Sequence, residues 1–435
     1  MKTIGRICLL FFLLSCCGKC WAEPSYQGKT LSAWLDDYGA GPRDYKPSPQ
    51  ADEALRQIGP EAVPYLLQLL HSTNPSSTIK VVPDTNQFSP PKPAVPAPAS
   101  WDHWKAYVAF QALGPLGKSA IPDLAKLAHD DPNGSSFYPN IQAMKDISAV
   151  AGLADNSSSY VVPGEFASFH GSEVMRSPLP FLVDGEIAAW SLAAIGADAV
   201  PSLMGLLDDP SPHLKQRAAE ALGLAGAAAE PAVPAIIKNL QGSDFGVRQR
   251  AADALGYVGR QPTLAIPALI DALKDSDVGV QLYAARSLGS FGDRATNAIS
   301  SLLVNFTAKD YRTRGSAAIA LSKISPEITA KQVVPSLFRQ LEDTNSWRNG
   351  ALVDLLQLNL EPDVMIPHLI KALDESNGSD NSFQVNAIQG LGKYGPAAKV
   401  AVPKLIPLLA DENYFVREHA TNALDKIEPG WRKGH

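Results

Sequence analysis

Four cationic side chains stand at equivalent positions of a repeated pattern, each fourteen residues after the second residue of a recurring dipeptide. They are Lys215, Arg248, Arg314 and Arg417. If they line one surface, they could meet an acidic peptide, a sulfated glycan or another anionic partner. The same position holds amides in other copies, at Gln281, Asn349 and Gln384. Amides favour a structural alternative, in which each side chain pairs with the helix-capping acid four residues earlier or with loop carbonyls of the next repeat.

Other residues that could do chemistry do not form a recognisable site. The eight histidines are scattered singly, and the chain has no H-E-x-x-H, G-x-S-x-G or phosphate-loop motif. The stretch "GLGKYG" at 390–395 matches G-x-G-x-x-G, but it follows a helical pattern, so we interpret it as a helix end. We therefore predict no catalytic residue, no metal ligand and no cofactor.

The recurring dipeptide sets the fold. A Val or Ile followed by Pro recurs along the chain, and from Pro201 its successive spacings are 33, 33, 33, 35, 32 and 36, with Ile299-Ser300 in one position. Each anchor is followed after two, three and six residues by apolar residues, which predicts a short helix with the proline in its first turn. A fixed period of this kind indicates a helical solenoid.

A second helix is predicted in every copy. Ten residues after the anchor stand residues that favour helix N-caps: Ser211, Asp244, Asp277, Asp310, Asn345, Asp380 after an insertion, and Asn413. Small residues such as Ala251 and Ala252 follow, then a leucine such as Leu255, and often a terminating glycine such as Gly259. Each copy is thus a helical hairpin whose exposed apolar faces are buried by stacking.

These second helices resemble the HEAT repeats, and most closely those related to the phycobilisome lyases, which read D-x-x-V-R-x-x-A-A-x-A-L-G. "DFGVRQRAADALG" nearly matches that pattern, and the resemblance covers about residues 50–428. It implies an all-α, right-handed α-solenoid (superhelix) of about nine hairpins, of the kind found in exported bacterial HEAT-repeat proteins. The resemblance says little about activity, because the scaffold serves many functions.

Two insertions interrupt the first half of the array. Residues 72–100 are rich in proline, which predicts an extended surface loop. Residues 130–182 carry aromatic residues outside the repeat pattern, and we name Tyr160, Phe166 and Phe169 as candidate partner contacts. The neighbouring helix, predicted at 101–114, adds Trp101 and Trp104. In the alternative interpretation, these aromatics only pack the insertion and the helix into the core.

Before the array, "YQGKTLSAWLDDY" at 26–38 predicts a short helix with Thr30 as N-cap. Its apolar face would cover the open side of the first repeat, so 23–49 is expected to be a capping segment. Residues 429–435 are expected to be a C-terminal tail.

Residues 1–22 have the layout of a secretory signal peptide, with Lys2, Arg6 and an apolar run from Ile7 to Leu14. Cleavage near Ala22 would remove all four cysteines and leave an acidic chain, since the whole sequence already has 44 acidic against 38 basic residues. We expect an exported protein, periplasmic or secreted. The alternative is a lipoprotein anchored through Cys16, the one case in which we expect a membrane partner.

Together these patterns predict a non-catalytic scaffold that presents an extended surface to a protein or an extracellular polymer. An acidic chain is a poor nucleic-acid binder, so we expect no nucleic-acid partner. The alternative is an enzyme, lyase-like or ligand-processing, or a small-ligand-binding protein. Its site would lie at the 130–182 insertion beside the 101–114 helix.

Overall fold

The computed structural model describes residues 23–39, 46–71, 98–130, 184–308, 310–342, 348–374 and 381–433. These residues form helices, apart from one two-stranded hairpin. The predicted leader at 1–22 and most of both insertions lie outside the described residues. The chain divides into two compact units, with the boundary between Leu206 and Leu207.

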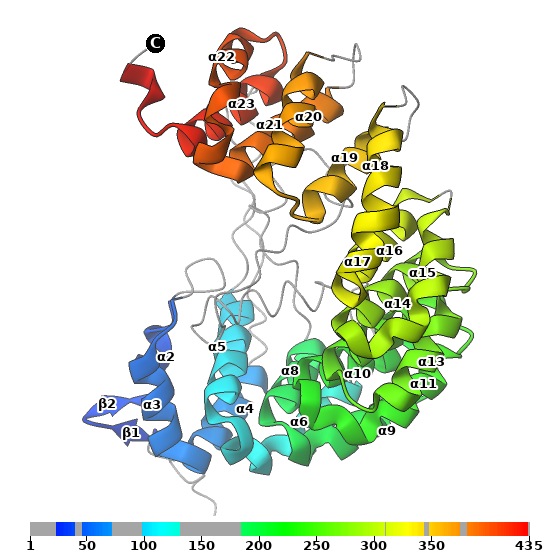
Figure 1. The fold of residues 1–435 in the computed structure, drawn as a ribbon. Coiled ribbons are helices and arrows are strands. Elements are labelled where there is room, and N and C mark those ends of the chain that lie inside the picture. The colour runs from blue at the N-terminus through cyan, green and yellow to red at the C-terminus, as the bar shows by residue number, and fades with distance from the viewer. Residues whose placement is uncertain are drawn as a thin grey trace, which may run out of the picture. The chain divides into compact units, whose positions relative to one another are not determined.

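The first unit opens on the hairpin and continues as helices (Figure 1). Its elements are β1 (Ser25–Tyr26), β2 (Lys29–Thr30), α2 (Leu31–Asp36), α3 (Pro49–Ile58), η1 (Gly59–Ala62), α4 (Val63–His71), α5 (Pro98–Leu113), η2 (Gly114–Ala120), α6 (Ile121–Asp130), α8 (Asp184–Ile195), η5 (Ala197–Ala199) and α9 (Val200–Leu207).

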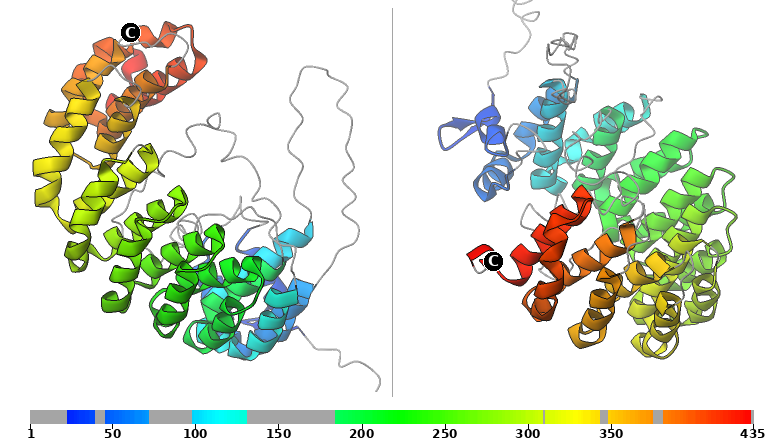
Figure 2. Two further views of the ribbon diagram at one scale, coloured as in Figure 1. Left: turned by 90° about the vertical axis from the view of Figure 1, so that its right-hand side faces the viewer. Right: turned by 90° about the horizontal axis from the view of Figure 1, so that it is seen from above.

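The second unit holds the regular part of the array (Figures 1 and 2). Its first half comprises α10 (Pro212–Ala225), η6 (Gly226–Ala232), α11 (Val233–Leu240), α12 (Phe245–Val258), α13 (Pro262–Ala272), α14 (Val278–Ser290), η7 (Gly292–Ala298), α15 (Ile299–Phe306) and α16 (Tyr311–Ile324). Its second half comprises α17 (Pro326–Ile328), a π-helical turn η8 (Thr329–Val333), α18 (Val334–Glu342), α19 (Arg348–Gln357), α20 (Pro362–Leu373), α21 (Ser382–Tyr394), η9 (Gly395–Ala401), α22 (Val402–Leu405), η10 (Pro407–Ala410), α23 (Tyr414–Ile427) and η11 (Trp431–Lys433).

In chain order, a first helix that carries the anchor dipeptide is followed by a second helix, and the described residues contain nine such pairs. Within the second unit, the second helices α10, α12, α14 and α16 pack against one another more extensively than the first helices do. In Figure 1, α11, α13 and α15 accordingly lie on the outer side of this layer. The predicted all-α solenoid class is confirmed.

The stretch Pro212–Leu240 is long and apolar enough to cross a membrane by length and composition. It comprises α10, η6 and α11, and Gly226 interrupts it with φ 58°. We therefore interpret it as two helices of successive hairpins in the second unit, joined by a turn.

The capping predictions are confirmed at most described positions. The side chains of Asp244 and Asp277 accept hydrogen bonds from the third backbone N–H of their helices, at 2.8 and 2.9 Å. Asp310 and Asn413 also cap, whereas Ser211 occupies the N-cap without a side-chain bond. Asn345 lies outside the described residues.

Two details of the prediction are wrong. The N-cap of α21 is Asn381, one residue after the predicted Asp380. The anchor proline does not lie in the first turn of α13 or α20, because both helices begin five residues earlier, at Pro262 and Pro362. In these two hairpins an α-helical turn replaces the 3₁₀ turn seen elsewhere, so Pro267 and Pro367 lie inside the helix.

The N-terminal segment contains a strand pair that the sequence analysis did not predict. Gln27 and Gly28 both have positive φ, 50° and 76°, which is the backbone of a tight hairpin turn. Thr30 caps α2 as predicted, and Leu31 and Leu35 are buried. At the other end, the predicted tail contacts α23, since Trp431 Nε1 donates to Asp425.

Both large insertions occur at the same kind of turn. The first follows α4 and the second follows α6, so each joins a first helix to its second helix. Their flanking helices differ slightly from the predicted bounds, since α5 already begins at Pro98 and α8 begins at Asp184. The turns that lead from a second helix to the next first helix stay short.

The glycine that follows the core leucine allows the second helices to approach each other. A Cβ on Gly256 would lie 2.4 Å from Ser287 Oγ and 2.8 Å from Ser287 Cα. Gly289 and Gly392 face alanine backbones in the same way, each at 3.1 Å. Close packing of the second-helix layer therefore depends on this position having no side chain.

We predict that Gly256→Ala destabilises the protein by about 1–3 kcal/mol, because the new methyl group has no space beside Ser287. The matched control is Gly205→Ala, since an added Cβ there meets nothing within 4 Å. That change should stabilise the helix by about 0.5–1 kcal/mol. Urea unfolding of the full chain measures both, and equal midpoints for the two variants would contradict the packing role.

Candidate functional site

The predicted cationic position closes the turn inside several hairpins of the second unit, and Arg248 shows this most fully. Arg248 Nη1 donates to the carbonyl oxygens of Gly242 and Ser243, at 3.1 and 2.9 Å. Its Nε and Nη2 donate to both carboxylate oxygens of Asp275 in the next hairpin, at 2.8 and 2.9 Å. Both side chains are 14% exposed. Arg248 therefore joins its own turn to the neighbouring one and is not available to an anionic partner.

The ion pair shifts both ionisation equilibria. Hydrogen bonding to Asp275 raises the pKa of Arg248, against a smaller effect of burial. Burial acts to raise the pKa of Asp275, but hydrogen bonds from Arg248 and from the backbone N–H of Asp277 outweigh it and lower that pKa. The pair therefore stabilises the fold fully at any pH above the pKa that Asp275 has in the unfolded chain. This stabilisation is lost as pH falls through the lower pKa that Asp275 has in the folded chain.

The same bond recurs in three further hairpins, always to the carbonyl six residues earlier. The donors are Gln281 to Asp275 at 2.7 Å, Arg314 to Ala308 at 3.2 Å, and Arg417 to Asp411 at 2.7 Å. Because the amide makes the same contact as the guanidinium, the property that these four positions share is hydrogen-bond donation to the turn that follows the first helix. The structural alternative is therefore supported, although the carbonyls belong to the residue's own hairpin.

Three of the seven predicted positions differ from this pattern. Gln384 donates to Leu373 O, eleven residues earlier, at 2.8 Å. At α19 the donor is Arg348, whose Nε bonds Leu341 O at 2.8 Å, while the predicted Asn349 bonds Ser382 and Asn386. The shift of one residue accompanies the longer spacing before this hairpin. Lys215 makes no side-chain hydrogen bond or ion pair with any residue that the structure describes.

The predicted aromatic contacts divide into core residues and residues that are not described. Trp104 is 2% exposed, and its ring packs 5.5 Å from Tyr107, which lies 5.9 Å from Trp190. This chain of rings forms part of the core of the first unit. The side chain of Trp101, together with Tyr160, Phe166 and Phe169, lies outside the described residues.

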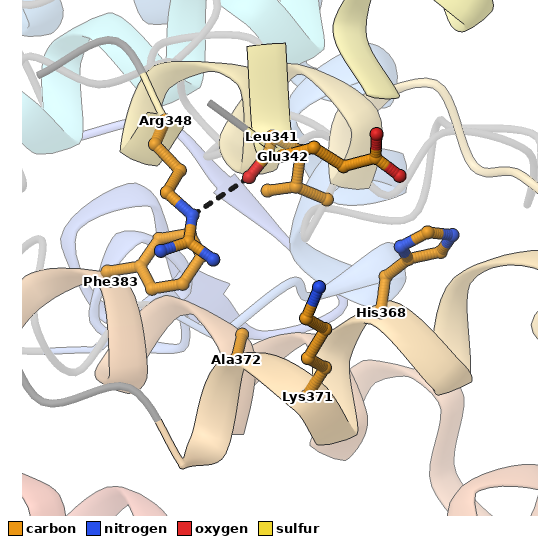
Figure 3. Close-up of a pocket in the computed structure, with 7 residues that line it drawn as sticks. All are labelled: Leu341, Glu342, Arg348, His368, Lys371, Ala372 and Phe383. Carbon is orange, nitrogen blue, oxygen red and sulfur yellow. Dashed lines mark hydrogen bonds between the residues drawn. The ribbon is translucent and has the colours of Figure 1, made fainter. Parts of the chain in front are cut away.

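A small pocket lies among α18, α20 and the first turns of α19 and α21 (Figure 3). Its lining residues are Leu341, Glu342, Arg348, His368, Lys371, Ala372 and Phe383. The space among these residues is about 230 Å³, part of which is open to solvent. The Arg348 guanidinium stacks on Phe383 at 4.5 Å and bonds Leu341, so it serves the hairpin turn. The pocket is therefore best explained by packing.

"GLGKYG" is part of a helix in the structure. Gly390 packs on Leu356 and Leu369, Gly392 packs on Ala423, and Gly395 ends α21 with φ 54°. The helix-end interpretation is confirmed for Gly395. The other two glycines serve close packing.

Asp354 is a buried acid that the sequence analysis did not single out. It is 6% exposed in α19, and its Oδ2 has no hydrogen-bond partner among the described residues. A Cβ on Gly315 of α16 would lie 2.5 Å from Asp354 Oδ1, so the glycine makes room for the carboxyl group. Burial raises the pKa of Asp354 to about 7, although Arg314 acts to lower it. Burial also lowers the pKa of Arg314, against the attraction of Asp354 and Asp310.

An exposed apolar row runs across four neighbouring second helices. We use this name for Pro212, Phe245, Val278 and Tyr311, the first residues of α10, α12, α14 and α16. Phe245 is 58% exposed and Tyr311 is 45% exposed. Pro212 is also exposed, and Val278 is half-buried. Its exposed members, Pro212, Phe245 and Tyr311, leave apolar surface facing solvent, which makes the row a candidate contact surface.

Comparison with known protein families gives one match. A family model of HEAT repeats matches residues 186–256, 233–322 and 266–357. Residues 186–357 are HEAT repeats. The apolar row therefore lies on HEAT-repeat second helices, and the repeat itself accounts for the fold of the surrounding hairpins. No curated protein matches the chain.

Several solved structures are similar at low scores. The complex of CpcE and CpcF of phycocyanin lyase from Nostoc sp. PCC7120 is 23% identical, covers 52% of this chain and 94% of that chain, and has a TM-score of 0.33. An engineered protein is 20% identical over 91% of this chain and 94% of its own, with a TM-score of 0.31. Human deoxyhypusine hydroxylase is 18% identical, covers 72% of this chain and 99% of that chain, and has a TM-score of 0.27. These scores carry no inference about activity.

The apolar row was not among the sequence-predicted site residues. Its signal is visible in the sequence, because 212, 245, 278 and 311 are spaced by 33 residues and all four residues are apolar. The position follows the N-cap directly, where an apolar side chain is usually read as part of a core stripe. Only the structure shows that these side chains point away from the core.

We predict that Arg248→Met destabilises the chain by about 2–4 kcal/mol, because it leaves Asp275 and two carbonyls without their donor. The matched control is Lys215→Met at the equivalent position, which should change stability by less than about 0.5 kcal/mol. Urea denaturation at pH 7 compares them. Similar losses in both variants would show that the turn bond is not what stabilises the hairpin.

We predict that Asp354 makes stability fall as pH rises. Its folded pKa of about 7 exceeds the unfolded value of 3.8, so its contribution is complete below pH 3.8 and is lost as pH rises through about 7. Asp354→Asn should remove this dependence between pH 4 and 8, while Asp363→Asn, at an exposed position in α20, should retain it. Urea midpoints across this range measure the effect, and an unchanged pH slope in Asp354→Asn would refute it.

Proposed function

We propose that the chain is a non-catalytic binding scaffold and that the apolar row is its main contact surface. The observation that carries the proposal is the row itself: equivalent apolar side chains on four neighbouring helices, of which Phe245 and Tyr311 are largely exposed. Aromatic residues dominate the binding energy of many protein interfaces. A repeated surface of this kind suits an extended partner, which touches successive hairpins in the same way.

The polar side chains of the second unit support the same proposal. The repeated cationic position, the best sequence candidate for electrostatic binding, is used to close turns at Arg248, Arg314 and Arg417. The carboxylate of Asp275 is used in the same network. Since these groups are committed to the fold, we propose that the apolar row, and not the repeated cationic position, is the main binding element.

We further propose that the scaffold acts outside the cytoplasm. The support is the signal-like pattern of residues 1–22, with basic residues, an apolar run and small residues near Ala22. A protein or an extracellular polymer is then the expected partner. The lipid-anchored alternative through Cys16 would place the same surface at a membrane.

The test is affinity capture from the exported fraction with the full mature chain. Phe245→Ser with Tyr311→Ser should abolish capture of the main partner, because it removes the two largest side chains of the row. The matched control is Val304→Ser with Val400→Ser, two residues of the same unit that are 69% and 67% exposed but lie outside the row. The control should capture normally.

A chain that lacks residues 131–183 provides the second comparison. Capture that survives this deletion but is lost in the row variant supports the proposal. Capture that is lost on deletion and unaffected by the row variant would place recognition at the insertion and would contradict it.

A further inference from the structure

The geometry of the apolar row restricts what can bind along it. This inference rests on the proposed function, because it names the partner of the same surface. Neighbouring packed helices are separated by about 8–10 Å. Successive row residues occupy the same position of successive packed helices, so they recur at about that interval. A partner that follows the row must therefore present an apolar group about every 9 Å.

Two regular polypeptide conformations satisfy this spacing. In the polyproline II conformation each residue advances about 3.1 Å, so every third residue recurs on one face after about 9 Å. In an α-helix every seventh residue recurs after about 10.5 Å. An extended β-strand does not, because residues three apart point to opposite faces.

The backbone at the row favours the first conformation. The row occupies helix starts, where the first N–H groups have no partner within the helix. The capping acids take the third N–H of α12 and α14 and the second and third N–H of α16. The first N–H groups, of Phe245, Val278 and Tyr311, are therefore the backbone donors at the row. A polyproline II chain makes no internal hydrogen bonds and offers a free carbonyl at every residue. An α-helix has used most of its carbonyls. The row therefore combines apolar rings with backbone donors, the pairing by which proline-rich segments are bound in aromatic grooves.

Acidic side chains beside the apolar row indicate the charge that its partner carries. An acid directly precedes three of the four row residues, at Asp244, Asp277 and Asp310. The capping bonds of all three use Oδ1, and Oδ2 has no hydrogen bond among the described residues. Oδ1 of Asp310 also lies 3.5 Å from Arg312 Nε, so its charge is partly balanced within its own hairpin. All three side chains are half-buried, so they still face solvent. A line of carboxylates beside the row favours a basic partner.

We propose that the apolar row binds a second polypeptide that is proline-rich and basic. It would adopt the polyproline II conformation, with an apolar residue at every third position against the row. Basic residues between them would face Asp244, Asp277 and Asp310.

The test is fluorescence anisotropy of the full mature chain with a labelled (Pro-Pro-Lys)4 peptide, which is about 37 Å long when extended in this conformation. We expect binding that weakens with salt. (Pro-Pro-Glu)4, of the same shape and opposite charge, should bind at least about tenfold more weakly. Phe245→Ser with Tyr311→Ser should lower affinity for (Pro-Pro-Lys)4 by about tenfold or more. Val304→Ser with Val400→Ser should leave it unchanged.

The double variant Asp244→Asn with Asp277→Asn removes the negative charge of two capping residues and keeps the caps. Asparagine caps helices as well as aspartate does, so stability should be retained. Affinity for (Pro-Pro-Lys)4 should fall and its salt dependence should weaken. Retained affinity in this variant, or equal binding of the lysine and glutamate peptides, would overturn the proposal.

Two further outcomes would also overturn it. If no peptide binds while capture from the exported fraction still depends on Phe245 and Tyr311, the proposed function stands and the partner class is wrong. If the peptide binds only after residues 72–97 are deleted, the occupant is the chain's own proline-rich segment. A second polypeptide would then not be the partner.

Discussion

The hydrogen bond that closes five hairpin turns of the second unit, from Arg248, Gln281, Arg314, Arg348 and Arg417, is the contact on which this part of the array most depends. In a helical hairpin the carbonyls of the turn that follows the first helix lie outside the hydrogen bonding of both helices. A donor from the first turn of the second helix satisfies them, as Arg248 does for Gly242 and Ser243. Because Arg248 also binds Asp275, the bond fixes the next hairpin relative to its own. One side chain thus sets both the turn within a repeat and the contact between repeats.

Other polar residues extend this coupling through the second unit. Asn239 and Asn305, two first-helix residues in alternate hairpins, donate to the last carbonyls of the preceding first helices at Leu207 and Leu273. Gln249 donates to the capping carboxylate of Asp277 in the next hairpin. These polar side chains make hydrogen bonds within the fold, whereas the exposed aromatic side chains at the helix starts, Phe245 and Tyr311, face solvent. The proposed function is based on this difference between polar side chains that stabilise the fold and apolar side chains that are exposed.

Much of the fold could be predicted because each structural role recurs in several copies of the repeat. The core leucine Leu255 and the capping Asp244 recur 33 residues later at Leu288 and Asp277, so the copies can be compared with one another within one sequence. That the repeated cationic position donates hydrogen bonds could be predicted from the amides at Gln281 and Gln384. Its acceptors could not, because Asp275 lies 27 residues from Arg248 and meets it only when two hairpins stack. Asp354 was not predictable for the same reason, since its space depends on Gly315 in another helix.

Hydrogen exchange of the full chain with and without its captured partner tests most directly whether the apolar row binds the partner while the hairpin-turn hydrogen bonds only stabilise the fold. We expect new protection in the first turns of α10, α12, α14 and α16, which carry the apolar row. Exchange at the hairpin turns closed by Arg348 and Arg417, which lie outside the row, should stay unchanged. Protection confined to other parts of the chain, with none at the starts of these four helices, would contradict the account.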